Sequence, residues 1–144
     1  MRLRAAFLAQ DAVQNQDGTF MVWRGGINKF QATSFPAPFR LFLILRLEAE
    51  GEEARSLHRL GLRVVHAGRE YPWQESPIAF KEPEPPDPHS YLNLLANLNL
   101  VLDSPGMGRV ELLIDEEGII PGLPFQVEQI PFPPGFPRSP DADS

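Results

Sequence analysis

The stretch YLNLLANLNLVL, from Tyr91 to Leu102, alternates between two kinds of side chain. Every even position is leucine or alanine, whereas three of the odd positions are asparagine. Successive side chains of a β-strand point to opposite faces of the sheet, so the even positions form one apolar face. A helix would scatter the asparagines around its surface. The stretch therefore predicts a strand.

The same period of two recurs along the chain. It is found in RLFLILRLE (40–48), LHRLGLRVVH (57–66) and GRVELLID (108–115). Frequent proline and glycine, 16 and 11 residues, favour short elements joined by turns. We expect an all-β fold, a two-layer antiparallel β-sandwich of about eight strands, either immunoglobulin-like or C2-like.

Two hairpins are expected near the ends of the chain. Residues 2–13 are expected to pair with residues 19–24, because Asp-Gly in the intervening QNQDG supplies the left-handed residue of a tight turn. Residues 115–118 are expected to reverse the chain toward a last strand, which Pro121 and Pro124 would confine to an edge or a bulge.

The linkers divide the chain into one domain and a tail. Residues 48–55 and 81–89 are expected to be loops, the second a proline-rich crossover between sheets. The domain is expected to cover residues 1–130. A proline-rich, flexible tail would follow in residues 131–144.

Composition excludes several partners and locations. The net charge of −6 gives no reason to bind a nucleic acid backbone. The absence of cysteine excludes disulfides, thiolate metal sites and cysteine nucleophiles. No apolar run is long enough for a signal peptide or a membrane span, so we expect a cytoplasmic protein without a membrane partner.

Catalytic and metal-binding patterns are weak. His58 and His66 share one strand face but would lie about 26 Å apart, too far to bind one ion. The serines occur in no GxSxG or SxxK motif, and WRGGINK lacks the spacing of a nucleotide-binding loop. We therefore predict no catalytic residue, no metal and no cofactor, and favour a protein that is not an enzyme.

Aromatic residues mark the candidate interaction surface. Trp23 is expected in the core of a strand that bends at Gly25-Gly26, with a binding surface that has Trp23 and Arg24 at its rim as the alternative. Tyr71 and Trp73 are the better candidates for exposed aromatic side chains.

Apolar residues on a second face suggest a partner. Phe42 and Ile44 lie opposite a row of leucines, so the outer face of their strand needs a cover from a loop, the tail or a second subunit. We prefer a homodimer packed through one sheet. Phe132 and Phe136 in the tail are candidate anchors for a groove on a partner protein.

The order of these segments is similar to that of a family of uncharacterised bacterial proteins, a domain of unknown function. The similarity rests on three segments, RAAFLAQDAVQNQDGTFMVWRGGINKF, FPAPFRLFLILRLE and PGMGRVELLIDEEGIIPGLPFQVEQI. The resemblance implies a compact β-sandwich in a bacterial, cytoplasmic protein, and it assigns no catalytic residue.

Two functions follow as hypotheses. The first is a non-enzymatic interaction or assembly module. The alternative is a domain that binds a small molecule or calcium at its loop ends, near Tyr71, Trp73 and the acidic turns, with hydrolysis as a further version of this site.

Overall fold

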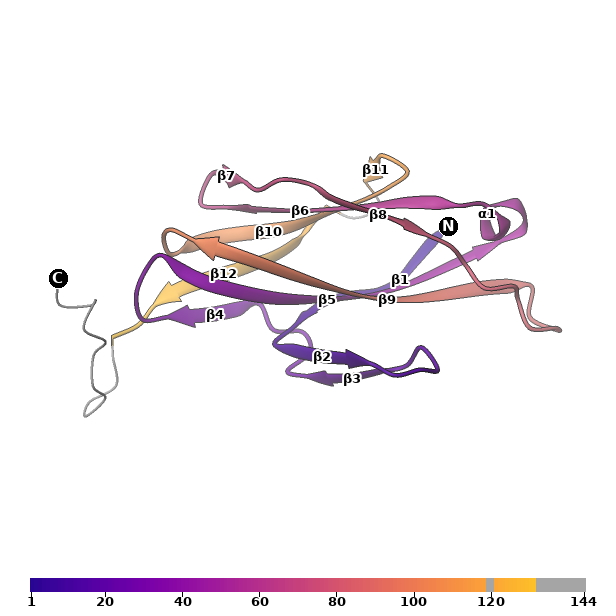
Figure 1. Cartoon of the computed structure of the whole chain (residues 1–144), viewed down its shortest axis with the longest axis horizontal. Helices are drawn as coiled ribbons and strands as arrows, with labels where there is room; N and C mark the ends of the chain where they lie inside the picture. The colour runs from indigo at the N-terminus through magenta and orange to yellow at the C-terminus, as the bar shows by residue number, and fades with distance from the viewer. Residues whose placement is uncertain (119–120, 132–144) are drawn as a thin grey trace.

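The computed structural model describes residues 1–118 and 121–131 (Figure 1). Twelve strands in these ranges form two packed sheets and a separate hairpin. The strands are β1 (Arg2–Ala9), β2 (Asp11–Gln14), β3 (Phe20–Trp23), β4 (Lys29–Ala32), β5 (Ala37–Glu50), β6 (His58–His66), β7 (Arg69–Glu70), β8 (Gln74–Ile78), β9 (His89–Leu102), β10 (Gly106–Ile114), β11 (Glu117–Gly118) and β12 (Leu123–Gln129), and the helix is α1 (Gly51–Arg55).

The first sheet has the order β1-β5-β9 and contains the two longest strands. β5 and β9 pair antiparallel over their full length, from Ala37 opposite Leu102 to Glu50 opposite His89. The alternation of β9 is confirmed, because Leu98 and Leu102 on its even face are buried in the core. The leucine row of β5 lies on the same side and is fully buried.

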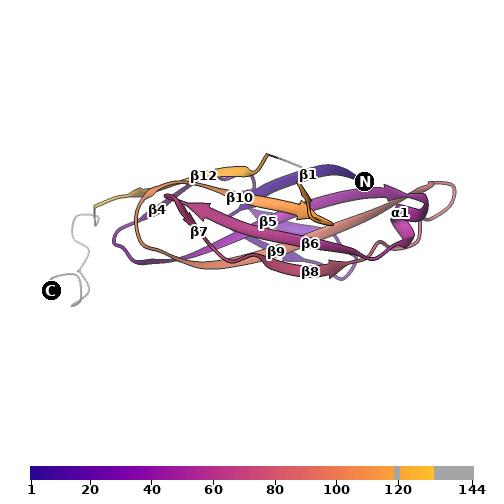
Figure 2. The same cartoon turned by 90° about the horizontal axis from the view of Figure 1, so that it is seen from above.

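The second sheet has the order β4-β12-β10-β6, and β6 then pairs with β7 and with β8 along different parts of its length. Leu62, Val64, Val110 and Phe125 turn inward from this sheet to complete the core. Figure 2 shows this layer lying over the first sheet. The predicted all-β sandwich is confirmed, with one addition: β4 and β12 run parallel to each other.

The β2–β3 hairpin covers the outer face of β5 (Figure 1). Phe42 and Ile44 are 4% and 2% exposed, and they pack with Ala12 and Val22 of the hairpin. The prediction that a loop, the tail or a second subunit covers these two residues is corrected, because the chain covers them with its own hairpin. They are therefore not part of an exposed surface.

The N-terminal hairpin is shorter than predicted. Only Asp11–Gln14 pairs with Phe20–Trp23, whereas β1 pairs with β5. The predicted bend at Gly25-Gly26 is present: Gly26 has φ of +85° and its N–H donates to the carbonyl of Leu8. This bond ties the end of the hairpin to β1.

Of the two predicted loops, one is present and the other is not. Residues 48–55 are not a loop, because β5 continues to Glu50 and α1 occupies Gly51–Arg55. Residues 81–88 do connect β8 to β9 and so cross from the second sheet to the first. Asp115 and Glu116 form the predicted reversal, both with positive φ, in the two-residue turn between β10 and β11.

Over the described ranges, no helix combines the length and the apolar character needed to span a membrane.

Candidate functional site

The free edge of β9 is the first feature of the site. β9 pairs with β5 on one side only. The carbonyl of Asn93 accepts a hydrogen bond from the Gln14 side chain at 3.0 Å, and that of Val101 accepts one from the Tyr71 hydroxyl at 2.9 Å. Both carbonyls therefore point away from β5.

The same alternation extends to the residues between them. In a regular antiparallel ladder, main-chain groups two residues apart point to the same side. The register of β5 and β9 has no shift, so the N–H and C=O groups of Leu95, Asn97 and Asn99 also face the free edge. Across residues 1–118 and 121–131, no main-chain hydrogen bond from outside the sheet reaches them, and the side-chain bonds to carbonyls of this stretch of β9 go to Asn93 and Val101. This five-residue stretch, 95–99, is called the open window below.

The sequence of β9 lacks the protection that edge strands usually carry. Proteins block free edges with charges, prolines, bulges or short strands. From Tyr91 to Leu102 there is no charged residue and no proline. Among the described strands, other outer edges do carry such features: β1 has Arg2, Arg4 and a register shift between Leu3 and Ala5, β4 has Lys29, β7 has two residues, and β8 has Glu75 and Pro77.

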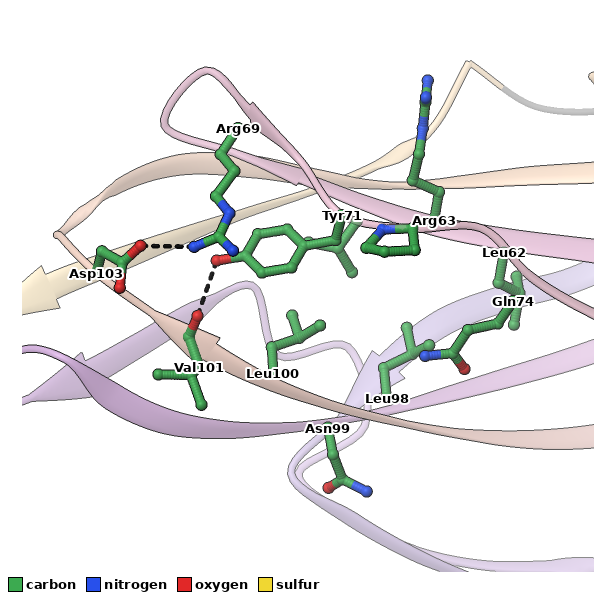
Figure 3. Close-up of a pocket in the computed structure, with 12 residues that line it drawn as sticks. Leu62, Arg63, Arg69, Tyr71, Gln74, Leu98, Asn99, Leu100, Val101 and Asp103 are labelled. Carbon is green, nitrogen blue, oxygen red and sulfur yellow. Dashed lines mark hydrogen bonds and ion pairs between the residues drawn. The ribbon is translucent and has the colours of Figure 1, made fainter.

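A groove of about 420 Å³ runs beside this edge, between β9 and the end of the second sheet (Figure 3). The two sheets diverge at this end of the sandwich, so core side chains of both sheets line the wall of the groove. Polar groups stand at its rim. The lining residues are Leu62, Arg63, Val64, Arg69, Tyr71, Pro72, Gln74, Leu98, Asn99, Leu100, Val101 and Asp103.

Tyr71 spans the groove from one sheet to the other. The turn at Ala67-Gly68, with both residues at positive φ, reverses β6 into β7. The N–H of Tyr71 then donates to the carbonyl of Val64, which fixes where the ring leaves the sheet. The Arg69 guanidinium lies 4.6 Å from the ring centroid and bonds Asp103 at 2.6 Å (Figure 3). This set of contacts limits the groove at the Val101 end.

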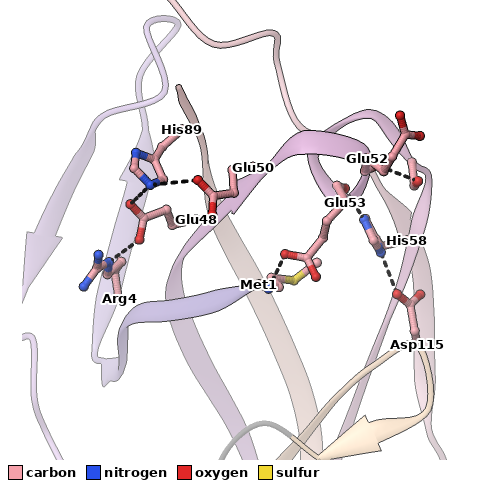
Figure 4. Close-up of polar contacts among 10 residues, drawn as sticks. Met1, Arg4, Glu48, Glu50, Glu52, Glu53, His58, His89 and Asp115 are labelled. Carbon is pink, nitrogen blue, oxygen red and sulfur yellow. Dashed lines mark hydrogen bonds and ion pairs between the residues drawn. The ribbon is translucent and has the colours of Figure 1, made fainter. Parts of the chain in front are cut away.

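A polar cluster lies around α1 and the neighbouring strand ends, and is the second candidate (Figure 4). The buried carboxylate of Glu48 accepts a hydrogen bond from Arg4, which lowers the pKa of Glu48 against the effect of burial. His89 Nε2 lies 3.3 Å from Glu50 and 3.8 Å from Glu48. These groups already pair with one another, so the cluster connects β1, β5 and β9 and aims no free group at a ligand.

His58 belongs to the same region. Its Nδ1 lies 2.5 Å from the Asp115 carboxylate and its Nε2 2.6 Å from the carbonyl of Glu53. Burial acts to lower the pKa of His58, but the two hydrogen bonds raise it overall. The bond to His58 in turn lowers the pKa of Asp115. In the part of the chain that the structure describes, no group of three or more His, Asp or Glu residues is placed to hold a metal ion.

Comparison with known families agrees with the extent of this sandwich. A family model described as a family of unknown function (DUF6941) matches residues 4–128. The chain belongs to this family. The match begins in β1 and ends in β12, so DUF6941 corresponds to the two-sheet fold, and the predicted resemblance to a family of unknown function is confirmed. A search of curated proteins found no match.

Tyr71 and Trp73 lie on opposite sides of the second sheet. Tyr71 lines the groove, whereas Trp73 packs on the outer face, where the Arg63 guanidinium lies 4.4 Å from its ring. The indole lies over Gly61, where a Cβ would make ordinary contact with it at 3.6 Å. The two aromatic residues therefore do not form one surface.

The prediction that Trp23 lies in the core is wrong. It is 48% exposed, because the alternation of β3 turns Phe20 and Val22 toward β5 and turns Met21 and Trp23 outward. Arg24 is exposed beside it with φ of +51°. Binding by Trp23 and Arg24 stays a prediction. Phe132 and Phe136 lie outside the described residues.

Proposed function

We propose that the protein is a non-enzymatic interaction module that binds an extended protein strand along the free edge of β9. The observation that carries this proposal is the open window, in which three successive outward-facing residues offer unpaired main-chain groups. Strand addition to a sheet edge draws affinity from main-chain hydrogen bonds and specificity from alternate side chains.

The groove supports the same function. A strand added beside β9 would turn alternate side chains toward the core side of the first sheet. There it would meet Leu98 and Leu100, which line the groove. The edge therefore supplies hydrogen bonds and the groove supplies apolar contacts.

A synthetic nine-residue peptide of alternating valine and threonine is a suitable probe. We expect it to bind and to slow hydrogen exchange at the amides of Leu95, Asn97 and Asn99, while the amides of Ala96 and Leu98 stay protected by β5 with or without peptide. Protection of the three amides without peptide also supports the proposal, because a second molecule of the chain would then occupy the edge.

Asn97→Pro is the matched variant. It removes one outward N–H from the window without removing a bond to β5. We expect it to fold and to lose peptide binding. If the unmodified protein shows no protection at the three amides under either condition, strand binding is wrong.

The groove also favours a second candidate, an amphipathic small molecule. Its volume of about 420 Å³ suits such a ligand, and Tyr71 and Gln74 offer polar groups beside an apolar wall. This candidate predicts that octanol shifts the methyl resonances of Leu62 and Leu98 and that Asn97→Pro leaves this binding unchanged. The bacterial and cytoplasmic setting rests on the sequence alone and remains part of the proposal.

A further inference from the structure

The open window of β9 is symmetric about Asn97. Four residues to either side, at Asn93 and Val101, the outward carbonyl is already bonded by a side chain of the same molecule. The free groups of Leu95, Asn97 and Asn99 lie between these two occupied positions. An antiparallel strand that carries free main-chain groups at the same spacing would pair with all three residues of this window.

We infer that the occupant of the β9 edge is a second copy of this chain, paired antiparallel about a two-fold axis at Asn97. This inference rests on the proposed strand binding and names its partner. The two copies would form one continuous sheet, and the same surface would serve on both sides, as in an isologous dimer.

The register follows from the occupied carbonyls. Asn97 lies opposite the partner's Asn97, and Leu95 lies opposite the partner's Asn99. Each hydrogen-bonded pair of an antiparallel ladder exchanges two bonds, so three pairs give about six. A register shifted by two residues would set Asn99 against the partner's Asn93, whose carbonyl is occupied. The symmetric register is the one that pairs all three open-window residues of one copy with those of the other.

The side chains of β9 are compatible with self-pairing. No charged residue occurs from Tyr91 to Leu102, so two copies meet without like charges on opposing strands. On the core side, Leu98 would face the partner's Ala96 and Leu100 would face the partner's Leu94. These apolar pairs lie at the groove. Other outer edges of the described chain carry charges, a bulge or a proline, or are short. The β9 edge has none of these features between Tyr91 and Leu102, so it can pair with the β9 edge of a second copy.

Single cysteines provide the test, because the chain has none of its own. In the proposed dimer the two Asn97 Cα atoms lie about 5.5 Å apart, within the range that a disulfide bridges. We expect Asn97→Cys to form a covalent dimer on mild oxidation. Val101→Cys is the control on the same strand face, and its two copies would lie about 26 Å apart, so it should not cross-link.

Sedimentation and exchange measurements complete the test on the unmodified chain. We expect a dimer at micromolar concentration, with exchange at the amides of residues 95, 97 and 99 that slows as concentration rises. Asn97→Lys sets two like charges opposite each other and is expected to weaken the dimer about tenfold or more. Circular dichroism should show that the fold is retained.

The outcomes separate the two proposals. A monomer that does not cross-link at Asn97→Cys but still binds the valine-threonine peptide overturns the self-pairing and leaves strand binding intact. Cross-linking of Val101→Cys in preference to Asn97→Cys also overturns it, because the register would be wrong. A monomer that binds no peptide overturns both.

Discussion

His58 shows how two acceptors hold a buried ring in its charged form. Both ring nitrogens face oxygen acceptors, the carboxylate of Asp115 and the main-chain carbonyl of Glu53. Only the imidazolium donates from both nitrogens at once. The ring thereby connects β6, α1 and the turn after β10.

Stability should therefore depend on pH through this residue. The folded pKa of His58 is raised, so its contribution is complete below about pH 6.5, the unfolded value, and is lost as the pH rises through the folded pKa. We expect the free energy of unfolding, from urea melts, to fall as the pH rises above about 6.5, more steeply in the unmodified protein than in His58→Gln. Parallel curves would contradict this prediction.

Gly108 is a second single-residue constraint. A Cβ at this position would lie 2.6 Å from Cζ of the buried Phe125 and 2.9 Å from the carbonyl oxygen of Val65. We expect Gly108→Ala to lower the free energy of unfolding by about 1–3 kcal/mol, because neither neighbour can move without repacking the core. Gly61→Ala is the control, since its Cβ would make ordinary contact with Trp73, and urea melts should place it within about 0.5 kcal/mol of the unmodified protein.

Among the elements, the β2–β3 hairpin acts as the cover of the first sheet. Val22 packs on Phe42 and Ile44, whereas Met21 points to solvent. We expect Val22→Ala to cost about 1–2 kcal/mol of unfolding free energy, from two lost methyl groups, and Met21→Ala to change it by less than about 0.5 kcal/mol. Equal effects in thermal or urea melts would show that the hairpin does not pack on β5.

Local alternation was sufficient to predict strands but not their neighbours. β5, β6, β9 and β10 follow from period two because their inward rows are almost continuous leucine, isoleucine and valine. The partner of β1 could not be predicted, since a short loop favours the nearest strand and only the completed sheet shows that β5 pairs with it. For the same reason, the sequence predicts a loop, the tail or a second subunit as the cover of Phe42 and does not indicate the β2–β3 hairpin.

Local sequence pattern could not predict the site either. A strand is an edge strand when no second strand pairs with it, and this depends on the whole sheet. An uncharged run as long as Tyr91–Leu102 is typical of a central strand, yet β9 has one neighbour. That mismatch between composition and position is the signal that identifies the open window. Tyr71 lines the groove, but local pattern could not place it there, because its position depends on the turn after β6.

At the scale of the whole molecule, the sequence predicts that residues 1–130 fold as one domain. The last strand of the described residues ends at Gln129, and the N–H of Ile130 still donates to the carbonyl of Ala32. We expect a chain that ends at Pro131 to keep the full free energy of unfolding, within about 0.5 kcal/mol in urea melts. A loss of more than about 1 kcal/mol would place residues beyond 131 in the folded domain.

The parallel pairing of β4 with β12 has a consequence for synthesis on the ribosome. β4 emerges long before β12, the strand that it pairs with. Translation at about 5–20 residues per second leaves β4 without this partner for several seconds. The second sheet of the nascent chain must therefore stay incomplete until β12 has left the exit tunnel.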